Sequence, residues 1–399
     1  MEKVSRRGFL RSSAAFFLSG VLGSGFNPMF DLCVHAYSSS DIKGEVFKGD
    51  APKRLWKYAR EGLFYQKSYG NKVACLVCPN HCILSPGDRS ACRSKVNLGG
   101  KLYTIAYGNP SSMTVDPIEK KPLFHFRPRT KAFSIATAGC NLRCLNCQNW
   151  EISQSKPEDV SFSDLFPADV VKAARASGSL SIAYTYTEPI SFYEYMYDTA
   201  KQARESSLAN VLVSNGYINT EPLLKLCTVL DGASIDIKSF SDDIYRKLNG
   251  GHLDPVLSTL KTLHDQNVHL EVSTLVVPGY TDKEEMIKRM CSWILKNVGP
   301  DHPFHFLRFF PTYKLDRLPA TPVSTLTRFR EIAMKEGVRY VYVGNVPEHE
   351  GNNTYCHSCG KLLIERKGYF IPTYNLNGNR CSFCKAIIPG VWDRSLSPA

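Results

Sequence analysis

Residues 138–150 read AGCNLRCLNCQNW and directly follow a β-rich run at 132–137. Three and then two residues separate the three cysteines of this stretch. A 4Fe–4S cluster usually takes four thiolates, one for each iron. We therefore predict that Cys140, Cys144 and Cys147 bind three irons of such a cluster from one compact loop. The fourth iron would then keep an open position for another ligand.

Strand-like and helix-like segments alternate from residue 132 onward, which predicts parallel strands wrapped by helices. Strands are predicted at 132–137, 180–186, 210–215, 232–237, 268–277, 304–310 and 338–343. Helices are predicted at 167–176, 190–206, 221–229, 254–266, 283–297 and 324–336, with a further helix at 55–69. Six or seven units are fewer than the eight of a closed barrel. The predicted fold is therefore an α/β partial barrel of the (β/α)6 type.

Polar residues follow the predicted strands at the same end of this barrel. Glu188 follows the second strand, Asn215 ends the third, and Asp236 and Lys238 lie at the end of the fourth. Because loops after parallel strands meet at one end of a barrel, these side chains should gather around the three cysteines. This setting favours an iron–sulfur site over a structural zinc site with a distant fourth ligand. A cap, a turn or a salt bridge is the alternative role for each polar residue, and Asp236 and Lys238 face the same side of their strand.

Two C-x2-C pairs near the C-terminus are separated by 21 residues, a spacing typical of a four-thiolate zinc site. A small fold of this kind needs a metal to be stable, so we predict a structural zinc-ribbon-like module. An electron-transfer iron site is the alternative. The predicted ligands are Cys356, Cys359, Cys381 and Cys384.

A third group of four cysteines lies before the barrel, and its spacing suits either zinc or a second iron–sulfur cluster. The sequence leaves the two open. The predicted ligands are Cys75, Cys78, Cys82 and Cys92. Cys33, Cys227 and Cys291 fit no ligand pattern, and we predict that the last two are buried small hydrophobic residues.

The three-cysteine loop, together with SNGY at 214–217, DIK at 236–238 and VPGY at 277–280, resembles the pyruvate formate-lyase activating group of radical S-adenosylmethionine (SAM) proteins. A fuller resemblance is to the radical SAM enzymes of the AmmeMemoRadiSam system, and it covers residues 55–384. The motifs that carry it are CLVCPNHC at 75–82, DPIEKKPL at 116–123, QNWEISQ at 148–154, YTYTEP at 184–189 and YVYVGNVP at 340–347.

This resemblance implies that SAM binds the open iron through its amino and carboxylate groups. Glu188 stands where related enzymes carry a Gly-Gly-Glu-Pro-like motif that meets the SAM amino group. Asn215 and Asp236 would lie near the ribose or the methionyl portion, and Lys238 near the carboxylate. The residue before the third cysteine is usually aromatic and packs near the adenine. Here it is Asn146, so the adenine contact must come from elsewhere.

The implied activity is reductive cleavage of SAM to a 5′-deoxyadenosyl radical, with electrons from a low-potential donor. Similarity to activating enzymes suggests a protein substrate, whereas the AmmeMemoRadiSam resemblance suggests Memo-like and AMMECR-type partner proteins. An exported iron–sulfur electron-transfer protein without SAM cleavage is the alternative. A nucleic-acid modifier is favoured only by the formal net charge of +12. Since the chain has no run of five Lys or Arg residues, we do not expect nucleic acid as a partner.

The N-terminus carries an export pattern. SRRGFL at 5–10 matches the twin-arginine motif, an apolar stretch follows at 14–26, and VHA at 34–36 suits signal peptidase. The stretch is short and glycine-rich, so no transmembrane helix is predicted. We expect export to the periplasm or the outer face of the cytoplasmic membrane, the alternative being a cytoplasmic protein that keeps its N-terminus. The predicted units are a signal peptide at 1–36, a cysteine-rich segment at 37–110, the barrel at 111–349 and the zinc-ribbon-like module at 350–394.

Overall fold

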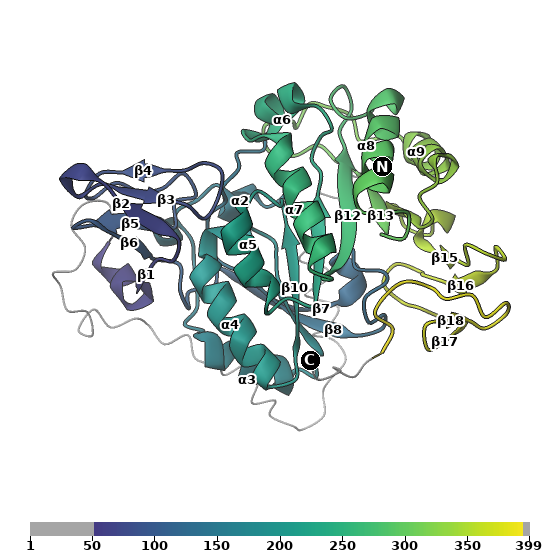
Figure 1. Cartoon of the computed structure of the whole chain (residues 1–399), viewed down its shortest axis with the longest axis horizontal. Coiled ribbons are helices and arrows are strands. Elements are labelled where there is room, and N and C mark those ends of the chain that lie inside the picture. Colours follow the sequence, from purple (N-terminus) through teal and green to yellow (C-terminus); the bar gives the residue numbers. More distant parts are fainter. Residues whose placement is uncertain (1–51, 394–399) are drawn as a thin grey trace, which may run out of the picture. The chain divides into compact units, whose positions relative to one another are not determined.

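The computed structural model describes residues 52–393 and contains an eight-stranded sheet in the order β14-β13-β12-β11-β10-β9-β8-β7 (Figure 1). Strands β8 to β14 run parallel, and β7 pairs antiparallel with β8. The bounds are β7 Ser112–Pro117, β8 Lys131–Ala136, β9 Ser181–Tyr184, β10 Ala209–Ser214, β11 Gly232–Asp236, β12 His269–Val276, β13 Phe304–Arg308 and β14 Val341–Gly344. Because β7 and β14 are the two edges of this sheet and do not pair, the predicted partial barrel is confirmed. It holds seven parallel strands, one more than the six-unit type.

Helices connect the parallel strands, as the alternation predicted. They are η6 Pro189–Phe192, α3 Pro167–Ala176, α4 Tyr193–Glu205, α5 Thr220–Cys227, α6 Asp242–Asn249, α7 Leu253–Asp265, α8 Glu284–Asn297 and α9 Val323–Glu336. The sequence analysis missed α6. This helix has acidic residues in its first turn and ends at Gly250, whose left-handed conformation closes the helix.

The cysteine-rich N-terminal segment forms two small antiparallel sheets. One has the order β1-β6-β5 and the other β2-β3-β4. Their bounds are β1 Arg60–Glu61, β2 Tyr65–Lys67, β3 Val73–Cys75, β4 Ile83–Leu84, β5 Lys95–Leu98 and β6 Lys101–Thr104, with short 3-10 turns η2 Lys53–Tyr58 and η3 Tyr69–Asn71.

The helix predicted at 55–69 is therefore wrong beyond its first turn. Leu55, Trp56 and Tyr58 do bury their side chains, but they do so from η2 against Val96 and neighbouring residues. After η2 the chain pairs with β6, and the Gly62 N–H donates to the Leu102 carbonyl oxygen at 2.7 Å. Phe64 has a φ of 52°, which a right-handed helix excludes. Pairing with β6 thus outweighs the local helical pattern.

The C-terminal module contains two hairpins, β15–β16 and β17–β18. Their bounds are β15 Thr354–Tyr355, β16 Leu362–Ile364, β17 Leu376–Asn377 and β18 Arg380–Cys381, preceded by η7 Glu350–Asn352. Arg366 is almost fully buried and donates to the Phe124 carbonyl oxygen at 2.9 Å. The Val391 N–H donates to the His125 carbonyl oxygen at 2.7 Å.

These contacts place the module at the amino end of the barrel strands. The backbone N–H groups of Phe124 and His125 donate to the buried carboxylate of Glu271, near the start of β12. His269 and His305 bind the same carboxylate at 3.0 and 2.7 Å. Although burial opposes it, these two imidazoles hold the pKa of Glu271 below its usual range. Residues at the amino end of barrel strands serve stability, since the chemistry takes place at the carboxyl end.

The predicted signal peptide at 1–36 lies outside the described residues. Within residues 52–393, every helix is too short or too polar to cross a bilayer.

Candidate cofactor site and metal centres

The loop after β8 carries the three cysteines and continues into the short helix α2, Trp150–Ser153. Donor groups of the chain point at two of the sulfurs. The Leu142 N–H donates to Cys140 Sγ at 3.4 Å, and Asn249 Nδ2 donates to Cys144 Sγ at 3.2 Å. Such N–H···S bonds are typical of sulfurs that bind an iron–sulfur cluster.

The environment of the three thiols fits a bound cluster. Burial raises the pKa of Cys140, Cys144 and Cys147, so their thiolate forms need the positive charge of a bound metal. Within residues 52–393, Asn146 Oδ1 and Asn249 Oδ1 are buried without a hydrogen-bond partner. Unpartnered buried polar atoms are rare in folded proteins and often mark a missing ligand.

Gly139 precedes the first cysteine and must be a glycine. Its φ is 103°, and a Cβ atom there would lie 2.3 Å from the Cys92 carbonyl oxygen. The three-cysteine loop thus packs directly on the backbone of the N-terminal cysteine group, closer than any other residue type would allow.

Glu188 lies at the start of η6, almost completely buried. Its Oε1 accepts from the Ile190 N–H at 3.1 Å and from Ser214 Oγ at 2.7 Å. Its Oε2 accepts from the Asn215 N–H at 2.9 Å. Burial raises the pKa of Glu188 to about 7. The carboxylate therefore joins the ends of β9 and β10, and a carboxylate oxygen with one donor has a second lone pair for a further donor.

Asn215 fixes the three-cysteine loop. Its Nδ2 donates to Asn141 Oδ1 at 2.9 Å and lies 3.9 Å from Cys140 Sγ, and its Oδ1 accepts from the Tyr217 N–H at 2.8 Å. Asn141 in turn donates to the Tyr217 carbonyl oxygen at 2.8 Å. The predicted proximity of Asn215 to the cysteines is therefore present, and the side chain serves to position the loop.

Asp236 and Lys238 bind each other at 2.9 Å. Because β11 ends at Asp236, Lys238 lies in the loop after the strand and not on the strand face that the sequence predicted. The Ser273 hydroxyl also donates to Asp236. Although burial opposes it, Asp236 raises the pKa of Lys238 and keeps it cationic. Both side chains are about a quarter to a third exposed, at 24% for Lys238 and 36% for Asp236. They can therefore meet a ligand at the mouth of the barrel.

Sequence reasoning missed a polar group that connects β7 to the loop after β9. Lys121 Nζ donates to Asp116 at 2.6 Å and to the Tyr186 hydroxyl at 3.1 Å. Burial lowers the pKa of Lys121 to about 8, and although burial opposes it, Lys121 holds the pKa of Asp116 low. Asp116 and Lys121 lie in the DPIEKKPL motif at 116–123. The sequence did not predict that this motif contacts Tyr186. The signal in the sequence was the cluster of four charged residues at 116–121.

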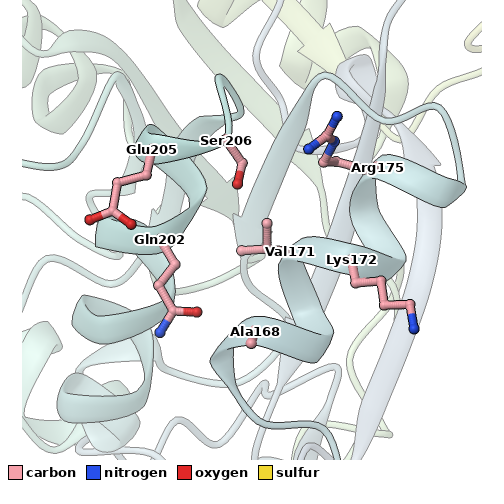
Figure 2. A pocket seen from close by; sticks show the side chains of 7 residues that line it. All are labelled: Ala168, Val171, Lys172, Arg175, Gln202, Glu205 and Ser206. Atoms are coloured by element: carbon pink, nitrogen blue, oxygen red, sulfur yellow. The ribbon is translucent and has the colours of Figure 1, made fainter.

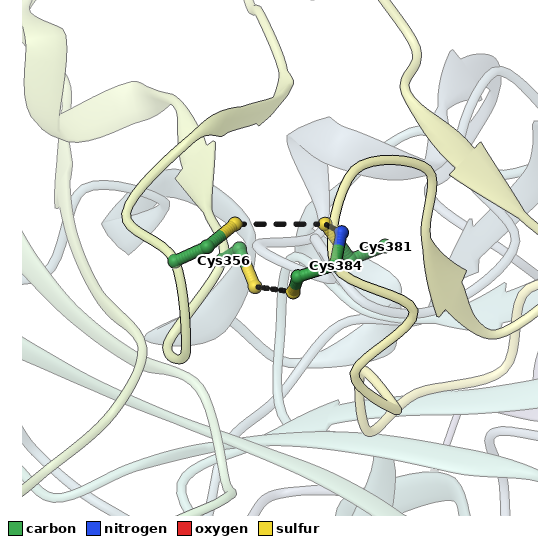
Figure 3. A group of neighbouring side chains, drawn as sticks. Cys356, Cys381 and Cys384 are labelled. Atoms are coloured by element: carbon green, nitrogen blue, oxygen red, sulfur yellow. Dashed lines mark hydrogen bonds between the residues drawn. The ribbon is translucent and has the colours of Figure 1, made fainter.

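The C-terminal cysteines form a compact group (Figure 3). All four sulfurs lie within 4.8 Å of one another. Cys356 Sγ is 3.6 Å from Cys384 Sγ, and Cys359 Sγ is 3.8 Å from Cys381 Sγ. Tetrahedral zinc with Zn–S bonds of about 2.3 Å separates its sulfurs by about 3.8 Å. The arrangement is suited to one metal ion.

The N-terminal cysteines are also brought together, because all four line one small cavity with Asn141 of the three-cysteine loop. Of the two cysteines predicted to be buried hydrophobic residues, Cys291 is buried in the main core and confirms the prediction. Cys227 is only half-buried, at the end of α5.

A surface hollow between α3 and α4 is lined by Ala168, Val171, Lys172, Arg175, Gln202, Glu205 and Ser206 (Figure 2). It contains none of the predicted site residues. Its walls are the outward parts of two helices, so it is a groove between packed helices at a distance along the chain from the cysteine loops.

Comparison with known proteins agrees with this geometry. The Radical SAM superfamily model matches residues 134–291. "Uncharacterized protein MJ0808" of Methanocaldococcus jannaschii is 45% identical over 82% of this chain and 97% of its own. The pyruvate formate-lyase 1-activating enzyme of Escherichia coli K12 is 25% identical over 51% of this chain and 89% of its own.

Among solved structures, a domain of pyruvate-formate lyase-activating enzyme from Bacteroides vulgatus matches 41% of this chain and 99% of its own, at 13% identity and a TM-score of 0.37. The sequence matches, together with the cysteine loop at the carboxyl end of a partial barrel, lead to one conclusion. The chain carries a radical SAM domain at residues 134–291 and belongs to the same family as the Methanocaldococcus jannaschii protein.

Proposed function

We propose that this protein binds a 4Fe–4S cluster through Cys140, Cys144 and Cys147 and uses it to cleave SAM reductively. One observation carries the proposal. The three-cysteine loop, Glu188 and the pair of Asp236 and Lys238 all come from the carboxyl ends of adjacent parallel strands, where the active sites of barrel enzymes lie. When bound, the cluster and SAM together supply a 5′-deoxyadenosyl radical that abstracts hydrogen from a substrate.

The residues of the chain would divide the work of holding SAM. Glu188 has a lone pair on Oε2 that could accept a hydrogen bond from an N–H of the SAM amino group, while its other contacts fix the end of β10. Lys238 offers a cation for the SAM carboxylate, and Asp236 orients that cation. Asn215 positions the cluster loop through Asn141. The buried Asn146 Oδ1 would accept a hydrogen bond from the cofactor in place of the usual aromatic contact.

The direct test is product analysis. Anaerobically purified protein, reduced with dithionite and mixed with SAM, should release methionine and 5′-deoxyadenosine in equal amounts. Protein with a full cluster that releases neither would instead support an iron–sulfur electron-transfer protein without SAM cleavage.

We also propose a protein substrate within an AmmeMemoRadiSam-type system, with Memo-like and AMMECR-type proteins as partners. The resemblance of the motifs at 75–82, 116–123 and 340–347 supports this proposal. Substrates accelerate the formation of 5′-deoxyadenosine over the uncoupled rate in radical SAM chemistry. Each partner protein should therefore be added separately. The true substrate would raise the rate, and the hydrogen atom that it loses would appear in 5′-deoxyadenosine. Export by the twin-arginine route stays a prediction.

For the C-terminal group we propose zinc. The sulfur separations of 3.6 and 3.8 Å support it, and the position of the module at the amino end of the strands favours a structural role.

A first prediction concerns the pH dependence of SAM binding. The unfolded carboxyl of Glu188 has a pKa of 4.5, whereas burial raises the folded value to about 7. The folded chain thus holds an extra proton between these values, so this group destabilises the fold as the pH rises from 4.5 to 7. The ionised carboxylate is the stronger acceptor for an N–H of the SAM amino group, so SAM affinity should rise between pH 6 and pH 8.

The variant Glu188→Gln should bind SAM about tenfold more weakly at pH 8, because it loses a charge-assisted hydrogen bond. Its affinity should also vary less between pH 6 and pH 8. Equilibrium binding of SAM to the anaerobic protein measures both effects. A Glu188→Gln variant with the pH profile of the wild type would remove Glu188 from the SAM site.

A second prediction concerns Asn249, whose Nδ2 donates to Cys144 Sγ. A hydrogen bond to a ligand sulfur stabilises the more negative, reduced cluster. Asn249→Ala should therefore lower the reduction potential by a few tens of millivolts, since ~1 kcal/mol corresponds to roughly 40 mV for one electron. Potentiometric titration followed by electron paramagnetic resonance (EPR) measures the shift. Asn97→Ala removes a buried amide in the N-terminal segment that bonds only backbone groups, and it should leave the potential unchanged.

A further inference from the structure

The N-terminal cysteine group surrounds a cavity. Cys75 lies at the end of β3, Cys82 lies just before β4, and the two residues pair across this hairpin through the Cys75 N–H and the Cys82 carbonyl oxygen at 2.9 Å. Cys78 lies in the turn between them, and Cys92 comes from the loop before β5. All four line one small cavity.

The distances between the sulfurs distinguish a zinc ion from an iron–sulfur cluster, the two alternatives that the sequence left open. In the C-terminal group all four sulfurs lie within 4.8 Å of one another, as one zinc ion requires. Within residues 52–393 the N-terminal sulfurs form no such compact group of three or more, and neither do those of Cys140, Cys144 and Cys147. In a four-iron cluster each thiolate binds a different iron, so the sulfurs stand farther apart around a central volume.

We propose that Cys75, Cys78, Cys82 and Cys92 hold a second 4Fe–4S cluster, which passes electrons to the cluster of the three-cysteine loop. All four irons of this second cluster have a thiolate, so it has no open position for SAM. Its role is therefore electron transfer.

The surroundings suit the negative charge of such a cluster. The Ala91 N–H lies 3.4 Å from Cys82 Sγ, and Ser90 Oγ lies 3.1 Å from Cys92 Sγ. The ammonium of Lys95 lines the same cavity, 1% exposed, and binds both oxygens of Glu194 at 2.6 Å. Hydrogen bonds to the sulfurs stabilise the reduced state of a cluster, while the pair of Lys95 and Glu194 adds no net charge to the site.

The two cysteine sites share a wall. The Cys92 carbonyl oxygen packs where a Cβ of Gly139 would lie, and Asn141 lines the N-terminal cavity directly after Cys140. Asn80 Nδ2 donates to the Asn141 carbonyl oxygen at 2.7 Å and joins the two loops. Cys78 and Cys82 are only half-buried, so the N-terminal site is partly open to a donor.

Electron transfer from the second cluster to the cluster of the three-cysteine loop rests on the proposed function of that loop. Each electron that enters the second cluster leaves it again. A reduced low-potential carrier protein would give one electron to the second cluster and become oxidised. The second cluster would return to its oxidised state when that electron moves to the first cluster. Bond breaking would occur only afterwards, when the electron enters the sulfonium of SAM and methionine leaves.

Metal and sulfide analysis of the full chain, purified anaerobically from cells supplied with both iron and zinc, tests the site. Wild type should hold about eight irons, eight sulfides and one zinc. The variant Cys140→Ala/Cys144→Ala/Cys147→Ala should keep about four irons, four sulfides and the zinc. Wild type with about four irons and two zincs would overturn the proposal, and this result needs no variant to fold.

The variant Cys78→Ser/Cys82→Ser should lose about half of the iron, while Cys227→Ser, a half-buried cysteine outside the three groups, should lose none. In Cys78→Ser/Cys82→Ser, reduced ferredoxin should reduce the remaining cluster at least about tenfold more slowly than in wild type. An unchanged rate would exclude the relay. A change of the EPR signal on adding SAM reports the first site separately, so eight irons without that change would refute the proposed function and leave the second cluster standing.

Discussion

Replacing Cys140, Cys144 or Cys147 by alanine should reduce the release of 5′-deoxyadenosine to the level seen without protein. Each thiolate binds a different iron, so a cluster with two remaining ligands in this loop cannot keep one open iron beside SAM. Burial raises the pKa of all three thiols. Chromatography of the anaerobic reaction, with dithionite and SAM present, measures the product.

The matched control is Cys227→Ala, which removes a half-buried thiol outside the three cysteine groups. It should keep full product formation. Iron analysis distinguishes loss of the cluster from loss of the fold, because the N-terminal iron should persist in each single variant. Product formation above a tenth of the wild-type rate in any of the three alanine variants would contradict the ligand assignment.

The sequence alone predicted the parts of this protein in which local pattern and global fold agree. Buried parallel strands read as short apolar runs, and their alternation with helices gave the partial barrel. Cysteine spacing predicted three groups, and the structure brings together the four cysteines of the C-terminal group and the four of the N-terminal group. Asp236 and Lys238 were expected on one strand face, and they form an ion pair.

The local sequence pattern did not predict the contacts between segments that are distant along the chain. The helix predicted at 55–69 failed because Gly62 pairs with β6, about forty positions along the chain. Asn249 was not predicted as a partner of Cys144, since only the ending of α6 at Gly250 brings its amide to the sulfur. The choice between zinc and an iron–sulfur cluster also required the distances between the sulfurs, because both groups bind the same four thiolates.

The position of each cysteine group relative to the barrel strands supports a different proposed role for it. The three-cysteine loop lies at the carboxyl end of the strands, where the loops can meet a substrate. The N-terminal group shares a wall with that loop through Gly139 and Cys92. The C-terminal group lies at the opposite end, against Phe124 and His125. Damage to the third group should therefore affect stability before chemistry.

Replacing Cys381 by serine should remove the zinc and unfold the C-terminal module while SAM cleavage per cluster persists. The module has a small core of its own, which includes Cys356, Cys381 and Trp392. Structural zinc supplies about 10 kcal/mol or more of folding free energy in isolated zinc-finger peptides, and a core of this size cannot replace that contribution. Zinc analysis should fall from one ion to none. Limited trypsin digestion should then cut within residues 354–392 at least about tenfold faster.

The neighbouring variant Ser382→Ala provides the control, because Ser382 is exposed and its recorded hydrogen bonds use only its backbone. It should keep both the zinc and the resistance to trypsin. Arg366 and the pairing of Val391 with His125 join the module to the barrel, so some loss of barrel stability is also expected in Cys381→Ser. Complete loss of the iron in that variant would show that the barrel depends on the zinc to fold. Retained zinc would instead show that the ion binds elsewhere than between the two C-x2-C pairs.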